Sequence, residues 1–330
     1  MKFKRKGFNK IGIISILFWI FISSFFLSVG NGVVKLSPGE IVKSIFFKES
    51  SNFQIIWNVR IPRTLVAALV GICLSLSGVI LQGIMRNSLA GPNIIGVSSG
   101  AGLFALIILI IFPQYYYLVP MAAFSGALFA TLIVYILAWK EGAQPTRLIL
   151  AGVAVSSIFS AGSNALMTFF PEKVSGTINF MVGGLSAITW LDFKMILPYA
   201  IIGLISSFFL PSKLNILALG DEVATGLGLN VEKTRLTFII LSSLLAGSAV
   251  SIVGLLGFIG LIVPHMARLL LGSDYRYLFP GTILLGASTL MICDTLSRVL
   301  FAPMEIPVGI IMSIIGGPFF LYILRQKEGL

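Results

Sequence analysis

The chain has 330 residues, of which 57% are hydrophobic and 11% are charged, and its formal net charge is +11. Soluble domains carry about 25% charged residues, so this composition excludes a soluble globular protein. Cys73 and Cys293 are the two cysteines, and both lie within long apolar runs. A disulfide scaffold and a thiolate metal cluster are therefore excluded as well.

Apolar runs long enough to cross a membrane follow one another along the chain. One membrane helix needs about 20 apolar residues. The first run, Ile11 to Val29, follows a basic cluster between Lys2 and Lys10. It is too long for the core of a signal peptide, so we expect a retained first span with the N-terminus inside. Further spans are expected at about 64–84, 95–112, 118–138, 148–170, 193–210, 236–254, 257–271, 281–300 and 306–324.

The stretch 236–271 decides between nine spans and ten, because only glycines and Pro264 interrupt it. Lysine and arginine collect in the cytoplasmic loops of membrane proteins. Ten spans place 15 of the 23 basic residues inside, whereas nine spans give 12 against 11 and no bias. We therefore expect an all-α integral protein of the cytoplasmic membrane, with ten transmembrane helices and both termini in the cytoplasm. It forms one transmembrane domain over 1–330, with an extracytoplasmic segment at 31–63 and a cytoplasmic segment at 211–235.

A weak internal repeat accompanies these spans. The glycine, serine and glycine at positions 71, 75 and 78 recur at 247, 251 and 254, on spans expected to run in opposite directions. Inverted halves of this kind build many transporters. Small residues are common in membrane helices, so a chance match stays open.

The expected spans contain few groups that could carry out catalysis. Asp294 and Arg298 are four residues apart, so they share one helix face and can pair, either as a structural ion pair or as an anchor at the membrane surface. His265 is the one histidine, and packing at a kinked helix explains it better than a metal site. No phosphate-binding loop of the G-x-x-x-x-G-K-[ST] type occurs. We therefore expect no enzyme, no cofactor and no metal site in this chain, and ATP binding would require another subunit.

Hydroxyl and amide side chains form a stripe on the expected span 148–170, and the last span carries a further serine. The stripe includes Ser156, Ser160, Ser163 and Asn164, and the last span contributes Ser313. Such groups can line a path for a polar solute or let helices pack closely. Both alternatives stay open.

A series of short motifs along nearly the whole chain resembles the FecCD-type permease subunits of ABC importers for iron-siderophores, haem and cobalamin. The order of the motifs carries the resemblance more than any one of them. One departure is Ser88, where the family usually has proline. The matching stretches are 60–65 with 70–71, 86–90 with 95–100, 150–154, 217–224, 257–265, 294–298 and 305–309.

The resemblance implies the type II ABC importer fold and a set of partners. Two permease subunits, as a homodimer or a heterodimer, would stand beside each other above two cytoplasmic ATPases, and an extracytoplasmic binding protein would deliver the ligand. Arg60, Arg63 and Arg298 match the family's outward arginines, which pair with acidic residues of the binding protein. Guanidinium groups suit such bidentate contacts with carboxylates. Anchoring at the membrane surface is the alternative for Arg60 and Arg63.

Two cytoplasmic regions match further parts of the family. The segment 217–230 resembles the coupling helices that sit in a groove of the ATPase, with Leu219, Gly220, Asp221, Glu222, Ala224 and Gly228 as the expected coupling residues. Glycines permit tight turns there, and the two acids favour the start of a short helix. Pro145 and Thr146 resemble the family's cytoplasmic gate.

These observations predict the permease subunit of an ATP-driven bacterial importer for a ferric siderophore or a similar iron chelate. A cobalamin or haem importer is the alternative within the same family. An ion-coupled secondary transporter is a more distant alternative. Such carriers use ionisable groups or unwound ion sites within the membrane, and the sequence shows no such set in the expected spans.

Overall fold

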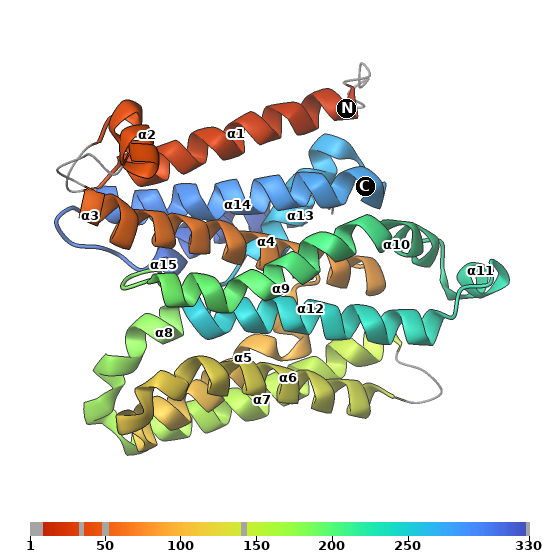
Figure 1. Cartoon of the computed structure of the whole chain (residues 1–330). Helices are drawn as coiled ribbons and strands as arrows, with labels where there is room; N and C mark the ends of the chain where they lie inside the picture. The colour runs from red at the N-terminus through yellow and green to blue at the C-terminus, as the bar shows by residue number, and fades with distance from the viewer. Residues whose placement is uncertain (1–8, 33–35, 48–52, 140–143, 328–330) are drawn as a thin grey trace.

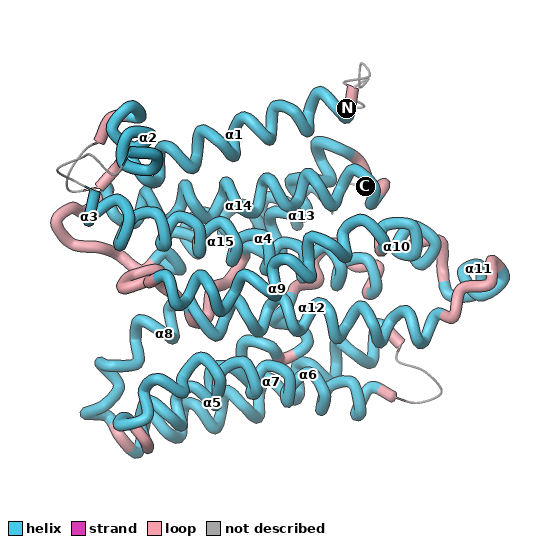
Figure 2. Tube along the Cα trace, in the orientation of Figure 1, coloured by secondary structure: helices cyan, strands magenta, loops and turns pink. Residues whose placement is uncertain are grey.

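The computed structural model describes residues 9–32, 36–47, 53–139 and 144–327, and these residues contain helices but no strand. Figure 2 shows the described chain as helices joined by short loops. The helices are α1 Lys10–Gly30, α2 Pro38–Phe47, α3 Phe53–Ile55, α4 Ile61–Ile84, α5 Val97–Leu106, α6 Val119–Ala138, α7 Pro145–Phe169, α8 Ile178–Val182, α9 Trp190–Phe209, α10 Pro211–Leu217, α11 Asp221–Gly226, α12 Val231–Val253, α13 Ile259–Leu271, α14 Tyr275–Val299 and α15 Val308–Lys327. A π-helical turn at Ile56–Arg60 joins α3 to α4, and another at Ile107–Ile111 extends α5.

Each expected span coincides with a helix of the structure. Among the described residues, seven helices are long and apolar enough to cross a membrane. Three shorter apolar helices, Val97–Ile111, Ile259–Leu271 and Val308–Tyr322, occupy the remaining expected spans. The apolar pattern of the sequence therefore predicted the helices correctly.

The stretch 236–271 forms two helices, as the charge distribution predicted. α12 ends at Val253, and the chain then turns through Gly254 and Phe258, both with positive φ, before α13 begins. The backbone of this break is bonded rather than exposed, because the N–H of Leu255 donates to the carbonyl of Phe180 over 2.8 Å. Internal satisfaction of backbone groups is what permits an interrupted helix at membrane depth.

The helices lie roughly antiparallel around α4, which is the most deeply buried of the long helices. α4 packs along α14, α12, α13 and α9. In Figure 1, α1 lies at the top against α14, and α5, α6 and α7 lie at the bottom. One end of the bundle carries α2 and α3, while α10 and α11 lie at the opposite end, where α1 begins and α15 ends.

Close approach of backbones fixes the packing of α4 against α13. A methyl group placed on Gly78 of α4 would overlap the carbonyl oxygen of Gly260 at the start of α13. Membrane helices gain contact area when small residues let their backbones meet in this way. Gly78 is therefore a position where the fold requires glycine.

Replacement of Gly78 by alanine is expected to lower stability by about 1–3 kcal/mol, the usual cost of overpacking. Thermal unfolding of the purified chain in detergent measures the effect. Gly317→Ala is the matched control, because nothing lies within 4 Å of a methyl group at that helical position. Equal melting temperatures for the two variants would contradict this account of the α4–α13 contact.

The two copies of the small-residue repeat pack on different partners. Gly71 lies against Gly286 of α14, whereas Gly247 lies against Phe124 and Ala127 of α6. The repeat therefore places a long helix from each half beside a helix from the other half. The inverted relation of the halves stays a prediction.

Candidate functional site

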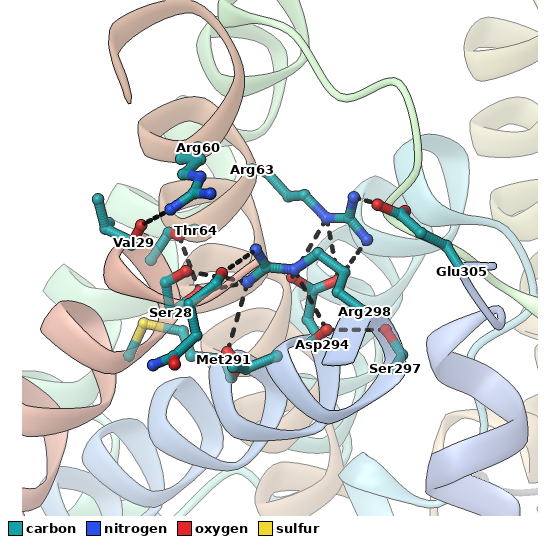
Figure 3. Close-up of polar contacts among 12 residues, drawn as sticks. Ser28, Val29, Arg60, Arg63, Thr64, Met291, Asp294, Ser297, Arg298 and Glu305 are labelled. Atoms are coloured by element: carbon teal, nitrogen blue, oxygen red, sulfur yellow. Dashed lines mark hydrogen bonds and ion pairs between the residues drawn. The ribbon is translucent and has the colours of Figure 1, made fainter. Parts of the chain in front are cut away.

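Three arginines meet at the end of the bundle that carries α2 and α3. Arg60 and Arg63 lie where α4 begins, and Arg298 lies in the last turn of α14. Asp294 of α14 and Glu305, in the loop before α15, complete a group that we call the arginine cluster (Figure 3). Because these residues come from distant parts of the sequence, the packing of α4 on α14 brings them together.

Asp294 is the shared acceptor of the arginine cluster. Its carboxylate is fully buried and accepts from Nη2 of Arg63 at 3.0 Å and from Nε of Arg298 at 3.1 Å. The expected pair of Asp294 and Arg298 is thereby confirmed, with Arg63 as a second partner. A buried carboxylate is tolerated when ionic partners and hydrogen bonds offset its lost hydration.

The remaining donors of the cluster tie it to the end of α1 and to the loop before α15. Arg298 donates to the backbone carbonyls of Ser28 and Asn31 at 3.0 and 2.9 Å, and Arg63 forms an ion pair with Glu305 at 2.8 Å. Arg60 donates to the carbonyl of Val29 at 2.8 Å. Three guanidinium groups and two carboxylates leave one positive charge in excess within the arginine cluster.

The three expected docking arginines therefore lie together, but each is more than nine-tenths buried and bonded to its own chain. The surface beside them is the loop 300–306, where Phe301 and Met304 are exposed. Contact with a binding protein stays a prediction for this end of the molecule. Sequence reasoning predicted the pair of Asp294 and Arg298, but it placed the acidic partner of Arg63 on another protein and so missed the contacts of Arg63 with Asp294 and Glu305. The available signal was Asp294, since an acid within an apolar span requires a cationic partner.

At the opposite end, α11 projects from the bundle on a glycine turn (Figure 1). Gly220 has φ of +115°, a conformation that side-chain-bearing residues rarely adopt. Asp221 then begins α11 and accepts from Arg86 at 2.7 Å and from Arg235 at 2.9 Å. These three residues, which we call the inner latch, connect α11 to the end of α4 and the start of α12.

The expected coupling residues divide between the two sides of α11. Ala224 is buried, whereas Leu219 and Leu227 are each 61% exposed and Val223 is 50% exposed. Glu222 and Gly228 are exposed. Val223 and Leu227 are four residues apart and lie on one side of α11, whereas Leu219 precedes the turn at Gly220. The region of α11 therefore exposes three apolar side chains.

The expected path residues lie on two helices with different neighbours. α7 packs on α5 and α6, whereas α15 packs on α13 and α14. Ser163 is buried and donates to the carbonyl of Phe159, while Ser156 is half-buried and Ser160 and Asn164 are exposed. In α15, Ser313 donates to the carbonyl of Gly309 at 2.8 Å.

The expected gate residues lie where α7 begins. Pro145 is the first residue of α7 and is half-buried, and Thr146 is exposed. Proline suits the first helical turn because its missing N–H has no partner there. Their gating role stays a prediction.

Near the inner latch, Asp274 caps α14 and joins it to α10. Its carboxylate accepts from Nη2 of Arg276 at 3.0 Å and from the side-chain amide of Asn215 at 2.9 Å. The Arg276 guanidinium in particular, with help from Asn215, lowers the pKa of Asp274 to about 2. A carboxylate with a lowered pKa stabilises the folded state fully above its ordinary pKa of about 3.9 and loses this effect as pH falls toward its folded value.

Asp274→Asn keeps a capping side chain but removes the charge, so we expect it to lower stability at pH 7 by about 1 kcal/mol. The difference from the wild type should shrink as pH falls from about 4 to about 2. Thermal unfolding across this pH range measures it, with exposed Glu172→Gln as the control. A difference between Asp274→Asn and the wild type that is independent of pH would contradict the assignment.

Comparison with known proteins places this architecture in a family. The FecCD transport family matches residues 20–326. The chain belongs to the FecCD transport family. It is 39% identical to the Fe(3+)-citrate import system permease protein YfmE of Bacillus subtilis, over 98% of each chain. It is 40% identical to the hemin transport system permease protein HmuU of Yersinia pestis, over 83% of this chain and 84% of that one.

A solved structure agrees with these sequence relatives. A metal-chelate type ABC transporter in an inward-facing conformation superposes with a TM-score of 0.83 and 30% sequence identity, covering 95% of this chain and 99% of that one. This chain therefore has the all-helical fold of a type II ABC permease, as the motifs predicted.

Proposed function

We propose that this chain is the permease subunit of an ATP-driven importer that carries a ferric chelate across the cytoplasmic membrane of a bacterium. The main observation behind this proposal is the 39% sequence identity to a ferric citrate import permease, over 98% of each chain. The fold of a metal-chelate ABC transporter supports the same conclusion. ATP hydrolysis belongs to separate subunits, and this chain provides the path.

The seven long and three shorter apolar helices would give ten spans in one domain over 1–330. Basic residues, among them Lys213, Lys233 and Arg235, gather in α10 and the start of α12, which favours a cytoplasmic position for that end. α1 begins and α15 ends at the same end (Figure 1), which agrees with cytoplasmic termini. The arginine cluster then faces outward.

The exposed apolar side chains in the region of α11 are suited to a groove of the ATPase. Leu219, Val223 and Leu227 would enter the groove, and the inner latch would carry its movement to α4 and α12. Two ATPases and a second permease subunit, identical or related, would complete the membrane complex.

The outer end would receive a binding protein that delivers the chelate. The excess positive charge of the arginine cluster attracts acidic groups and favours their approach. The loop 300–306 would make first contact, because it is exposed and Glu305 links it to Arg63. Arg60, Arg63 and Arg298 would then act in docking either directly or by positioning this loop.

Polar groups of α7 and α15 would line the path when two permease subunits stand together. Ser156, Ser160, Asn164 and Ser313 are uncharged, so they suit a bulky chelate that carries its own metal ligands. A ferric siderophore or ferric citrate fits this description, and haem or cobalamin is the alternative cargo. Pro145 and Thr146 would close the inner end.

Uptake of labelled ligands into cells that lack the gene tests the proposal. We expect the wild-type gene to restore uptake of one iron chelate, either ferric citrate or a ferric hydroxamate. Restored uptake of labelled haem or labelled cobalamin instead would move the cargo to the alternative. Dependence of none of these ligands on the gene would contradict the function.

A further inference from the structure

A cavity of about 270 Å³ lies between the end of α9 and the start of α12, near the end that carries α11. Its polar side is formed by Lys213 of α10 with Asn230, Lys233 and Thr234 around the start of α12. Its apolar side is formed by Leu210, Leu229 and Phe238. None of these residues belongs to the inner latch or to the arginine cluster.

The polar side of the cavity holds positive charge that the described part of the chain does not neutralise. Lys213 and Lys233 are exposed, and no acid of the described residues forms an ion pair with either. Asp221 is already held by Arg86 and Arg235. Glu232 does not line the cavity, although it precedes Lys233.

The position of Lys233 increases the positive potential. It is the third residue of the 23-residue helix α12, where the helix dipole already disfavours a cation. A bound anion would relieve this repulsion. The side-chain amide N–H groups of Asn230 and the hydroxyl of Thr234 are further donors on the same side of the cavity.

Leu210, which lines the cavity, directly follows exposed apolar residues at the end of α9. At the end of α9, Phe208 is 83% exposed and Phe209 is 73% exposed. Ile205, one turn earlier, is also exposed. Side chains of this kind on a membrane helix face lipid tails. The cavity therefore combines a cationic rim with a nearby apolar surface. An amphiphile with an anionic headgroup fits such a site.

We propose that this cavity binds the phosphate headgroup of an anionic phospholipid, with the acyl chains lying along the end of α9. Basic pockets between transmembrane helices on the cytoplasmic side are known to hold such headgroups. The inference rests on the proposed function for its orientation, because that end must face the inner leaflet. A lipid fits better than free phosphate, because free phosphate has no apolar group that could contact the apolar side of the cavity.

Native mass spectrometry of the full-length chain, with any subunits that co-purify, tests the proposal. Phosphatidylglycerol and phosphatidylcholine are titrated onto the wild type and onto Lys213→Gln/Lys233→Gln. We expect the wild type to retain phosphatidylglycerol in preference to phosphatidylcholine, and the double variant to retain it roughly 25-fold less, as expected for two lysines at an anionic lipid.

Two further variants separate charge from folding. Lys213→Arg/Lys233→Arg keeps both charges and is expected to retain the lipid. Lys43→Gln/Lys194→Gln removes two exposed charges from the opposite end and is expected to behave as the wild type.

Three results of the lipid titration would overturn the proposal. The first is equal retention of phosphatidylglycerol and phosphatidylcholine by the wild type. The second is equal retention of phosphatidylglycerol by Lys213→Gln/Lys233→Gln and the wild type. The third is displacement of phosphatidylglycerol by millimolar inorganic phosphate, which would show that the acyl chains contribute nothing to binding. Loss of a co-purifying ATPase with unchanged lipid retention would also overturn it, because the lysines would then contact protein. Lipid retention is measured without transport, so its failure is distinct from failure of chelate uptake.

Discussion

Asp294→Asn is expected to destabilise the protein by about 3–5 kcal/mol, the cost of removing one partner from a buried ion pair. The fully buried carboxylate holds Arg63 and Arg298 at 3.0 and 3.1 Å. Its loss would leave two guanidinium groups facing each other with only Glu305 as a charged partner. The melting temperature of the purified chain in detergent should fall accordingly.

A double-mutant cycle separates this electrostatic effect from a general loss of packing. Asp294→Asn combined with Arg298→Met removes one positive and one negative charge, so the pair should cost less than the sum of the single variants by about 0.5–3 kcal/mol. Glu172→Gln, an exposed acid, is the control. Additive effects, or an unchanged melting temperature for Asp294→Asn, would show that the arginine cluster does not support this end of the fold.

Asp221→Asn is expected to lower ATP-driven uptake about 5–150-fold, the range of a typical coupling free energy, while the ATPase stays bound. The Asp221 carboxylate connects α11 to Arg86, just after the end of α4, and to Arg235 of α12. An amide in its place weakens both charge-assisted bonds. Movement of α11 would then reach the spans less completely, although its apolar surface is unchanged.

Uptake and ATPase activity measured on the same preparation give the decisive comparison. Glu172→Gln is the control, because Glu172 is an exposed acid outside the coupling segment and has no ion pair among the described residues. Arg86→Ala leaves Arg235 in contact with Asp221 and should have an intermediate effect. Equal uptake by Asp221→Asn and Glu172→Gln would contradict the role of the inner latch.

The helices of the fold follow from local sequence. The run of apolar residues before Val253, the glycines that interrupt it and the basic residues beyond predicted both α12 and α13. The backbone at Gly254 and Phe258 explains the interruption, because the positive φ of Gly254 ends α12 and the positive φ of Phe258 precedes the start of α13. Local pattern was sufficient there, since helix formation and termination depend on neighbouring residues.

The partners of the charged side chains could not be predicted from the local sequence. Arg63 and Asp294 are 231 residues apart, and Arg86 and Asp221 are 135 apart. Their contact depends on how α4 packs against α14 and how α11 returns to the bundle. Only the pair of Asp294 and Arg298 lay within one helix, and that pair was predicted.

The family motifs supplied the regions of the site but not their internal bonds. They correctly indicated that Arg60, Arg63 and Arg298 belong together and that Asp221 starts a short helix. They did not indicate that carbonyls at the end of α1 accept from Arg60 and Arg298. Backbone acceptors of this kind leave no sequence signature, because every residue carries the same carbonyl.

The most direct test of the central claim is transport in proteoliposomes that contain this chain with its ATPases, supplied with a loaded binding protein outside. We expect a ferric chelate to accumulate only when ATP and Mg²⁺ are present on the ATPase side, and not with a non-hydrolysable nucleotide. Accumulation driven by an ion gradient in vesicles that contain this chain alone would contradict the account and would identify a secondary transporter.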